Sequence, residues 1–225
     1  MKPIELTDVE KSYGEATSLE AISLSFDPGW HIVLGPNGAG KTTLFRLLLG
    51  LTDPDAGQLS IPDGSVGCSF QEPQVYEGLT VRENLETFGE IAGASTDWLE
   101  TLLERCGLTR MAHRPAGALS AGFRSRLDVA LAFVNRPDIV LLDEPLADVD
   151  DEYVGRLREF FLEYAGPDRL FVVATHHHDR FIEIADTVTI LADGRVQWTG
   201  DPATAPAHDG EIKALYRDSI RTDET

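Results

Sequence analysis

Nine consecutive residues near the start of the chain carry the pattern of a phosphate-binding loop. They are Gly35, Pro36, Asn37, Gly38, Ala39, Gly40, Lys41, Thr42 and Thr43. The glycines let backbone N–H groups curl around phosphates, Lys41 adds a positive charge, and Thr42 offers a hydroxyl to Mg²⁺. A glycine-rich turn with one lysine is the alternative, but an apolar run (30–34) precedes the loop and an apolar helical stretch (44–49) follows it. The chain is therefore predicted to bind a nucleoside triphosphate.

A second group of candidate catalytic residues follows an apolar run later in the chain. Residues 138–142 read Asp-Ile-Val-Leu-Leu and lead into Asp143 and Glu144. Such a run is typical of a buried parallel strand, and ligands of open α/β sheets bind at the carboxyl edge of the strands. Asp143 is placed to hold Mg²⁺, directly or through water, and Glu144 to act as the general base for an attacking water. A solvated acidic loop is the alternative, which the phosphate-binding loop disfavours.

With these two motifs the chain resembles the nucleotide-binding subunits of ABC transporters, and the resemblance covers nearly all of it. Further matching segments are Lys11-Ser12-Tyr13-Gly14, Ser69-Phe70-Gln71-Glu72-Pro73, Leu119-Ser120-Ala121-Gly122-Phe123, Ala147-Asp148-Val149-Asp150 and Thr175-His176. The resemblance implies that Tyr13 stacks on adenine and that Gln71 contacts Mg²⁺ or the lytic water. It also implies that His176 contacts the γ-phosphate and holds that water.

The segment 119–123 corresponds to the signature motif that names the family. Ser120 can cap a helix whose apolar residues run to Val134, so that its hydroxyl and nearby N–H groups form an anion site. The resemblance implies that Ser120 and Gly122 face the γ-phosphate held by a second subunit. Each ATP would then lie between the phosphate-binding loop of one chain and the signature motif of the other.

Three positions depart from the family pattern. Ala121 and Phe123 replace the first glycine and the glutamine of the usual Leu-Ser-Gly-Gly-Gln, and Ala147 replaces a frequent serine. These changes leave a degenerate site or an asymmetric pair as alternatives. The catalytic set is nevertheless complete, with Lys41, Gln71, Asp143, Glu144 and His176. An active enzyme is therefore favoured.

The remaining histidines and cysteines carry weaker signals. His177 and His178 are interpreted as a polar turn leading into a helix at 179–185, with metal binding as the less favoured alternative because no spaced partners complete a site. Cys68 and Cys106 lack metal-ligand spacing and are expected to be buried apolar residues, neither ligands nor a disulfide. This cysteine usage is typical of a reducing cytosol.

Composition narrows the class of protein further. The 225 residues, 42% of them hydrophobic, suffice for one sizeable core. No apolar run approaches the roughly 20 residues of a membrane-spanning helix, so a membrane link must come through a partner. The net charge of −19 disfavours nucleic-acid binding, because such proteins present a basic surface to phosphates. With only four lysines, this charge indicates a protein that works in concentrated salt; an ordinary acidic cytosolic protein is the alternative.

The expected fold is α/β, a P-loop NTPase core of the ABC ATPase type with an N-terminal β-rich subdomain and a helical insert. Strands are expected at 4–9, 18–26, 30–34, 58–61 and 65–70 and from about 138, 170, 187 and 195. A capping box at 80–83 opens one helix of the insert, and Asp97 is expected to cap another that runs through 100–106. The resemblance implies one ABC ATPase domain over 1–225, with a nucleotide-binding core at 1–71 and 138–225 and a helical subdomain at 72–137.

The predicted function is ATP hydrolysis by a cytosolic subunit docked to a separate transmembrane permease. Two subunits, identical or different, would close on two ATPs, with Lys41 and Mg²⁺ neutralising the phosphates. The segment after Gln71, notably Tyr76, Leu79 and Arg82, is expected to face the permease. The alternatives are a soluble ABC-type ATPase acting on cytosolic partners and a non-hydrolysing half of an asymmetric pair. The transported substrate is set by the permease; the transport direction stays open, with a lean towards export.

Overall fold

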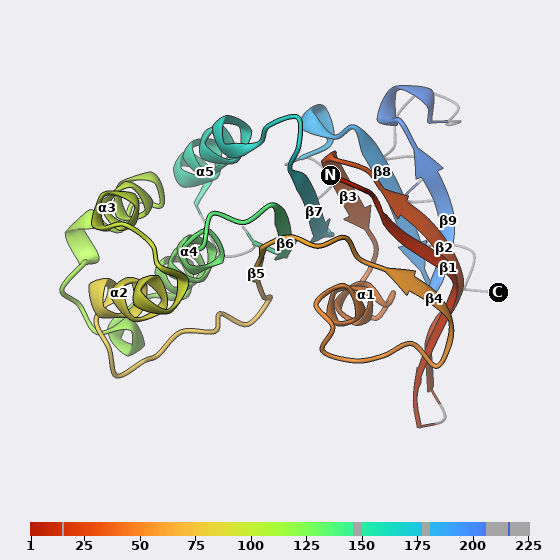
Figure 1. Cartoon of the computed structure of the whole chain (residues 1–225), viewed down its shortest axis with the longest axis horizontal. Coiled ribbons are helices and arrows are strands. Elements are labelled where there is room, and N and C mark those ends of the chain that lie inside the picture. The colour runs from red at the N-terminus through yellow and green to blue at the C-terminus, as the bar shows by residue number, and fades with distance from the viewer. Residues whose placement is uncertain (15, 146–149, 177–180, 206–215, 217–225) are drawn as a thin grey trace. The chain divides into compact units, whose positions relative to one another are not determined.

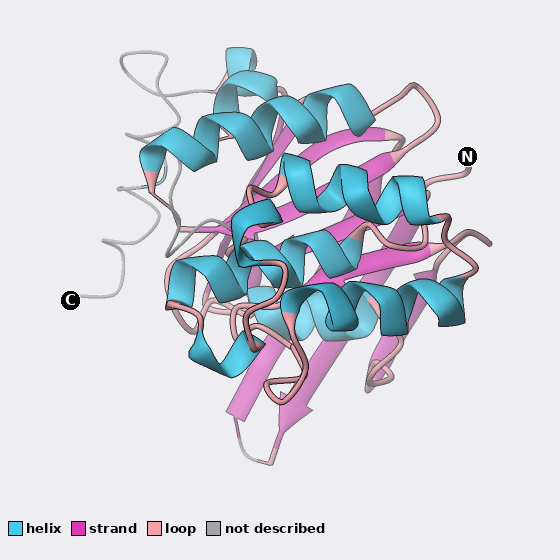
Figure 2. Cartoon of the chain, turned by 90° about the vertical axis from the view of Figure 1, so that its left-hand side faces the viewer, coloured by secondary structure: helices cyan, strands magenta, loops and turns pink. Residues whose placement is uncertain are grey.

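The chain combines helices and strands, as expected for an α/β protein (Figure 2). The computed structural model describes residues 1–14, 16–145, 150–176, 181–205 and 216. The chain divides into two units, Met1–Asp63 with Leu170–Thr225 as the first and Gly64–Arg169 as the second. In the described residues no helix has the length and apolarity needed to span a membrane.

Three strands of the first unit form an antiparallel sheet (Figure 1). Strand β1 (Ile4–Tyr13) lies between β2 (Ala16–Phe26) and β4 (Ala56–Ser60). Buried and exposed side chains alternate over much of β1 and β2, because one face of this sheet covers the core. The register of β1 shifts between Leu6 and Val9, where Asp8 has φ 49°, as in a β-bulge.

Two parallel strands of the first unit lead directly into the phosphate-binding loop and His176. Strand β3 (Gly29–Leu34) lies between β7 (Leu170–Thr175) and β8 (Thr187–Ala192) and is parallel to both. Strand β9 (Arg195–Gly200) pairs antiparallel with β8, and helix α1 (Lys41–Leu48) follows β3. Every residue of β7 is buried, which is why it reads as a continuous apolar run.

The second unit combines one strand pair with helices. Strand β5 (Val66–Ser69) is parallel to β6 (Ile139–Asp143). Its helices are α2 (Val81–Ala92), α3 (Thr96–Arg105), α4 (Ala121–Ala132) and α5 (Asp151–Tyr164), with single 3₁₀ turns at Thr109–Met111 and Ala116–Ala118. Aromatic rings from three segments, Trp98, Phe133 and Phe160, pack together, with 4.9 Å between the centroids of Phe133 and Phe160.

The helix caps test two sequence predictions. The capping box is confirmed: Glu83 N–H donates to Thr80 Oγ1 at 3.2 Å, and Thr80 N–H donates to the Glu83 carboxylate at 2.8 Å. The prediction that Asp97 caps the next helix is wrong, because Ser95 is the N-cap and its hydroxyl accepts from Trp98 N–H. Asp97 lies in the first turn, where a carboxylate still interacts favourably with the helix dipole.

Two further sequence predictions concern His177 with His178 and the two cysteines. His177 and His178 lie outside the described residues, and of the helix expected at 179–185 the structure describes one 3₁₀ turn, Ile182–Ile184. Both cysteines are free thiols, Cys106 buried and Cys68 half-buried. Burial raises the pKa of Cys106 to about 12 and that of Cys68 to about 11. Both thiols are therefore protonated and inert near neutral pH.

Candidate functional site

Two glycines give the phosphate-binding loop its shape. Gly40 is the N-cap of α1 with φ 103°, and a Cβ atom there would lie 2.6 Å from the carbonyl oxygen of Ser18. Gly38 has φ 87°, but a Cβ atom at this position would meet no atom within 4 Å. Packing therefore requires Gly40, whereas Gly38 borders open space in which a phosphate can approach the backbone.

The polar residues that follow the loop have different surroundings. Lys41 Nζ donates to the carbonyl oxygens of Gly35 and Pro36 at 2.7 and 3.0 Å, which holds the ammonium against the loop. Thr43 is buried, with its hydroxyl oxygen 2.7 Å from that of Ser18 on β2. Thr42 is exposed, so that its hydroxyl is the one accessible to a cation.

Strand register brings His176 to the same edge as this loop. In the parallel pair of β3 and β7, Leu34 lies opposite Thr175. Gly35 and His176 are the next residues of the two strands, and neighbouring strands are about 4.8 Å apart. The first unit therefore gathers the phosphate-binding loop and the exposed His176.

Tyr13 also belongs to the first unit. It ends β1 and is exposed, and the Lys11 ammonium lies 5.8 Å from the centroid of its ring. Lys11 is fixed by Asp55, at 2.9 Å, and by the carbonyl oxygen of Asp53, at 2.8 Å. An exposed aromatic ring at a strand end can stack on a nucleobase, which is the role predicted for Tyr13.

The second unit gathers the carboxylates and the glutamine in the same manner. Ser69 lies opposite Leu142 in the parallel pair of β5 and β6. Gln71 comes two residues after Ser69, and Glu144 comes two residues after Leu142. Asp143 and Glu144 are both buried. Glu144 has φ 50°, a strained conformation for a residue other than glycine and one that recurs in active sites.

The signature segment stands at the start of α4. Ser120 occupies the N-cap position with φ −67° and ψ 163°, but its side chain makes no capping hydrogen bond. The predicted helix start is confirmed, and the exposed hydroxyl is not used to cap α4. The first N–H groups of a helix attract anions, so the anion site stays a prediction that the local geometry fits.

Arg126 is a structural residue that the sequence analysis missed. Its guanidinium lies 4.5 Å from the ring centroid of Phe123 and 3.5 Å from that of Tyr153. It also pairs with Asp150 at 2.8 Å, and Asp150 is the N-cap of α5. Phe123, in place of the usual glutamine, thus covers a buried cation. Residues 147–149 of the predicted D-loop lie outside the described residues.

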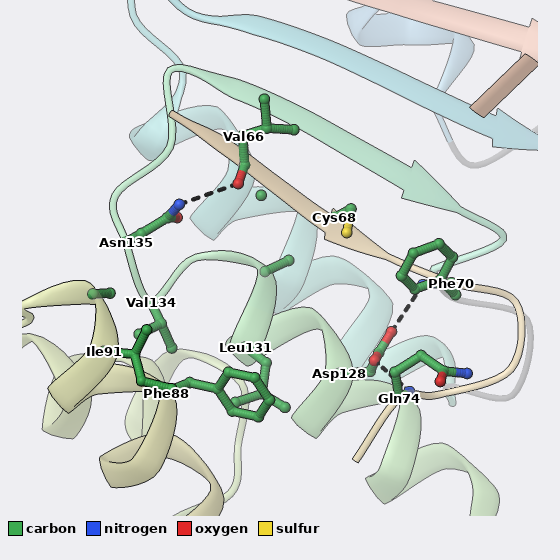
Figure 3. A pocket seen from close by; sticks show the side chains of 13 residues that line it. Val66, Cys68, Phe70, Gln74, Phe88, Ile91, Asp128, Leu131, Val134 and Asn135 are labelled. Carbon is green, nitrogen blue, oxygen red and sulfur yellow. Dashed lines mark hydrogen bonds between the residues drawn. The ribbon is translucent and has the colours of Figure 1, made fainter. Parts of the chain in front are cut away.

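Asp128 is a second residue that the sequence analysis missed. It lies on α4 and is only 4% exposed, yet its carboxylate accepts from Phe70 N–H at 2.9 Å and from Gln74 N–H at 2.7 Å (Figure 3). Burial raises the pKa of Asp128 to about 6, although the two N–H donors oppose this shift. The sequence feature that could have indicated this residue is a single carboxylate within an apolar helical run, 127–131.

The raised pKa of Asp128 gives stability a testable pH dependence. Between the ordinary value of 3.8 and about 6, the folded chain keeps a proton that the unfolded chain has lost. The contribution of this residue to the free energy of unfolding therefore falls as the pH rises through that window. Asp128→Asn should remove the dependence, so that denaturant titrations at about pH 5 and 7 show the wild type losing stability relative to the variant. A difference that does not change with pH would contradict the raised pKa.

The described residues hold no cluster of three or more His, Cys, Asp or Glu side chains that could bind a metal ion. The predicted Mg²⁺ ligands are of another kind, with one carboxylate (Asp143), one hydroxyl (Thr42) and one amide (Gln71). Mg²⁺ bound with a nucleotide needs few protein ligands, because phosphate and water oxygens complete its shell. These hard oxygen donors fit Mg²⁺.

Comparisons with known proteins agree with this chemistry. The family model for ABC transporters matches residues 19–147. A Nod factor export ATP-binding protein of Burkholderia lata is 33% identical over 89% of this chain and 71% of its own length. A lantibiotic transport ATP-binding protein of Streptococcus pyogenes is 27% identical over 86% of this chain and 88% of its own.

A solved structure extends the agreement to the fold. An ATP-binding subunit of an ABC transporter superposes with a TM-score of 0.80 and 26% identity, covering 88% of this chain and 90% of the other. The predicted ABC ATPase fold is thereby confirmed. The chain belongs to the ABC transporter family and is an ATP-binding subunit with ATPase chemistry.

Proposed function

We propose that this chain hydrolyses ATP as one half of a dimer and so drives a separate transmembrane permease from the cytoplasmic face of a membrane. The observation that carries the proposal is the matching strand register in both units. It gathers the phosphate-binding loop with His176 in one unit, and Gln71 with Asp143 and Glu144 in the other. These are the groups that in-line phosphoryl transfer to water requires.

Each group has one part in the proposed reaction. The loop N–H groups and Lys41 bind the β- and γ-phosphates, and the carbonyl contacts of Lys41 hold its ammonium beside them. Glu144 takes the proton of the attacking water, while His176 and Gln71 orient that water behind the γ-phosphate. Mg²⁺, held by Thr42, Gln71 and Asp143, would neutralise the charge that develops on the phosphates. Tyr13 would stack on the adenine.

The dimer follows from the placement of Ser120. Its exposed hydroxyl and the first N–H groups of α4 offer an anion site to a second chain, and Gly122 allows close approach. Each γ-phosphate would then contact the loop of one chain and the signature motif of the other. Opening and closing of the pair is the step that importers and exporters share, and the proposal concerns this step.

An apolar cavity in the second unit supports docking of a permease. It has a volume of about 300 Å³ and is bordered by β5, α2 and α4. Figure 3 shows Phe70, Phe88 and Leu131 among its lining side chains, and Ile91 at its rim is 81% exposed. Exposed apolar surface of this kind marks interaction sites. We propose that a cytoplasmic segment of the permease occupies it.

Tyr76 lies beside this cavity, against its lining residue Phe88, and is the residue best placed for a test. It is 56% exposed and stacks on Phe88, with 5.6 Å between the ring centroids. Of the other residues expected to face the permease, Leu79 is half-buried, and Arg82 pairs with Glu100 of α3. The guanidinium of Arg82 is thus already engaged within the unit.

Tyr76→Ala is expected to weaken association with the membrane subunit by about tenfold or more, because buried aromatic anchors dominate interfaces. Basal ATPase activity should stay within about twofold, since Tyr76 contacts no predicted catalytic group. Co-purification from detergent extract and ATP turnover of the isolated chain measure the two effects. Leu51→Ala is the matched control: Leu51 is 63% exposed but lies in the first unit. Equal losses in both variants, or none in either, would count against this docking surface.

A further inference from the structure

One buried carboxylate holds both ends of the segment that carries Gln71. Asp128 Oδ2 accepts from Phe70 N–H, and Asp128 Oδ1 accepts from Gln74 N–H. Residues 71–73 lie between these two anchors, with Gln71 and Glu72 exposed. The Gln74 side chain closes the turn by donating to the carbonyl oxygen of Glu72 at 2.8 Å. The backbone on both sides of Gln71 is therefore fixed to α4, as Figure 3 shows for Phe70 and Gln74.

The chemistry of this contact requires a carboxylate. Two N–H groups point to one side chain from positions four residues apart, so each needs an acceptor, and an ionised aspartate offers two acceptor oxygens and no donor. Asparagine offers one oxygen, and its NH₂ group would face the second N–H group. Ionising Asp128 in this buried position is costly, as its raised pKa indicates. A buried charged residue that lowers the stability of the fold, yet has its hydrogen bonds satisfied, is typical of a functional position.

The following segment has an anchor of its own. Asn84 on α2 accepts from Tyr76 N–H at 2.8 Å and donates to the carbonyl oxygens of Tyr76 and Thr80 at 3.0 and 2.9 Å. Asn84 is fully buried, and its side-chain hydrogen bonds go to residues 76–80. The two halves of the connection between β5 and α2 are thus held by different helices. Asp128 of α4 holds the half that carries Gln71.

We propose that Asp128 is a positioning residue for ATP hydrolysis: it fixes residues 70–74 on α4 so that Gln71 is presented to the nucleotide. This inference rests on the proposed function, because it assigns Gln71 to the lytic water or Mg²⁺. Asp128 itself touches neither. Its effect on turnover must therefore pass through Gln71.

A double-mutant cycle tests this dependence. Asp128→Asn is expected to lower kcat by about tenfold, with the KM for ATP changed by less than about twofold, since the phosphate-binding loop is untouched. In a Gln71→Ala background the same substitution should lower kcat by less than about twofold, because the residue through which it acts is gone. Equal losses in the two backgrounds would overturn the proposal, since a merely structural role is additive.

Hydrogen exchange supplies a readout that does not depend on activity. The amides of Phe70 and Gln74 should exchange at least about tenfold faster in Asp128→Leu, and at least one of them should do so in Asp128→Asn. Val129→Ala, on the same helix, is the control, because its buried side chain has no polar atom to bind the segment. Unchanged exchange in both Asp128 variants, or equal changes in Val129→Ala, would overturn the proposal. If the wild-type chain showed no ATPase activity, the proposed function would fail, and exchange would still decide whether Asp128 holds the segment.

Discussion

Glu144→Gln should slow ATP hydrolysis by about 10²–10⁴-fold, the range typical of a lost general base. Glutamine keeps the shape and the hydrogen-bonding ability of Glu144 but cannot take a proton from water. The substitution should leave the strained backbone, φ 50°, and the burial of the side chain as they are in the wild type. Binding of MgATP should survive, because Lys41, Thr42 and Asp143 are untouched. Phosphate release and equilibrium nucleotide binding measure the two effects separately.

The same variant should also reveal the dimer. With hydrolysis blocked, MgATP should hold two chains together, and size-exclusion chromatography should show the doubled mass. Each chain carries a net charge of −19, so the experiment needs molar salt to screen repulsion between the subunits. Adding Ser120→Arg should dissociate the dimer, because it places bulk and a cation at the positive end of α4. Ser60→Arg, on the exposed face of β4, is the matched control.

Two outcomes would change the assignment. Retained turnover in Glu144→Gln would remove Glu144 as the base. A variant that binds MgATP yet never dimerises, even with the membrane subunit supplied, would favour a non-hydrolysing nucleotide-binding module. Dissociation by Ser60→Arg as well as by Ser120→Arg would indicate a general charge effect and no specific contact at the signature motif.

The parts of the fold that depend on local patterns could be predicted from the sequence. A motif or an unbroken apolar run of about ten residues or fewer was enough to predict each of three features. These are the loop 35–43, the capping box at Thr80 and the buried strands. The cap of α3 could not be located in this way. Ser95, Thr96 and Asp97 are all good capping residues, and the apolar spacing that follows fits a start at any of them. In the structure the N-cap is Ser95, whose hydroxyl accepts from Trp98 N–H.

Contacts that join distant segments were missed for a different reason. Asp128 binds backbone N–H groups 54 and 58 residues away, and backbone donors leave no trace in the sequence. Arg126 forms its ion pair 24 residues away, although its spacing from Phe123 on one helix was visible. Both residues lie on α4, close to the signature motif. Sequence motifs thus predict the groups that would contact a nucleotide, whereas the structure adds the residues that hold those segments.

The glycines of the phosphate-binding loop should separate packing from phosphate binding. Gly38, Gly40 and Gly50 all have positive φ, so alanine at any of them costs about 1–2 kcal/mol of backbone strain. At Gly40 the new Cβ atom would also lie 2.6 Å from Ser18 O, so Gly40→Ala should cost about 3 kcal/mol or more in total. At Gly38 and Gly50 no atom lies within 4 Å, and only the strain applies.

The three alanine variants should rank differently in their affinity for MgATP than in their stability. Gly38→Ala places a methyl group in the open space beside the loop and should weaken binding by about tenfold, or about 1.4 kcal/mol. Gly50→Ala carries the same strain beyond the end of α1 and should bind MgATP like the wild type, which makes it the matched control. Gly40→Ala should lose both stability and binding. Denaturant titration and calorimetry of MgATP binding test the pattern. If Gly38→Ala and Gly50→Ala bound MgATP equally well, the open space beside Gly38 would not be where the phosphates lie.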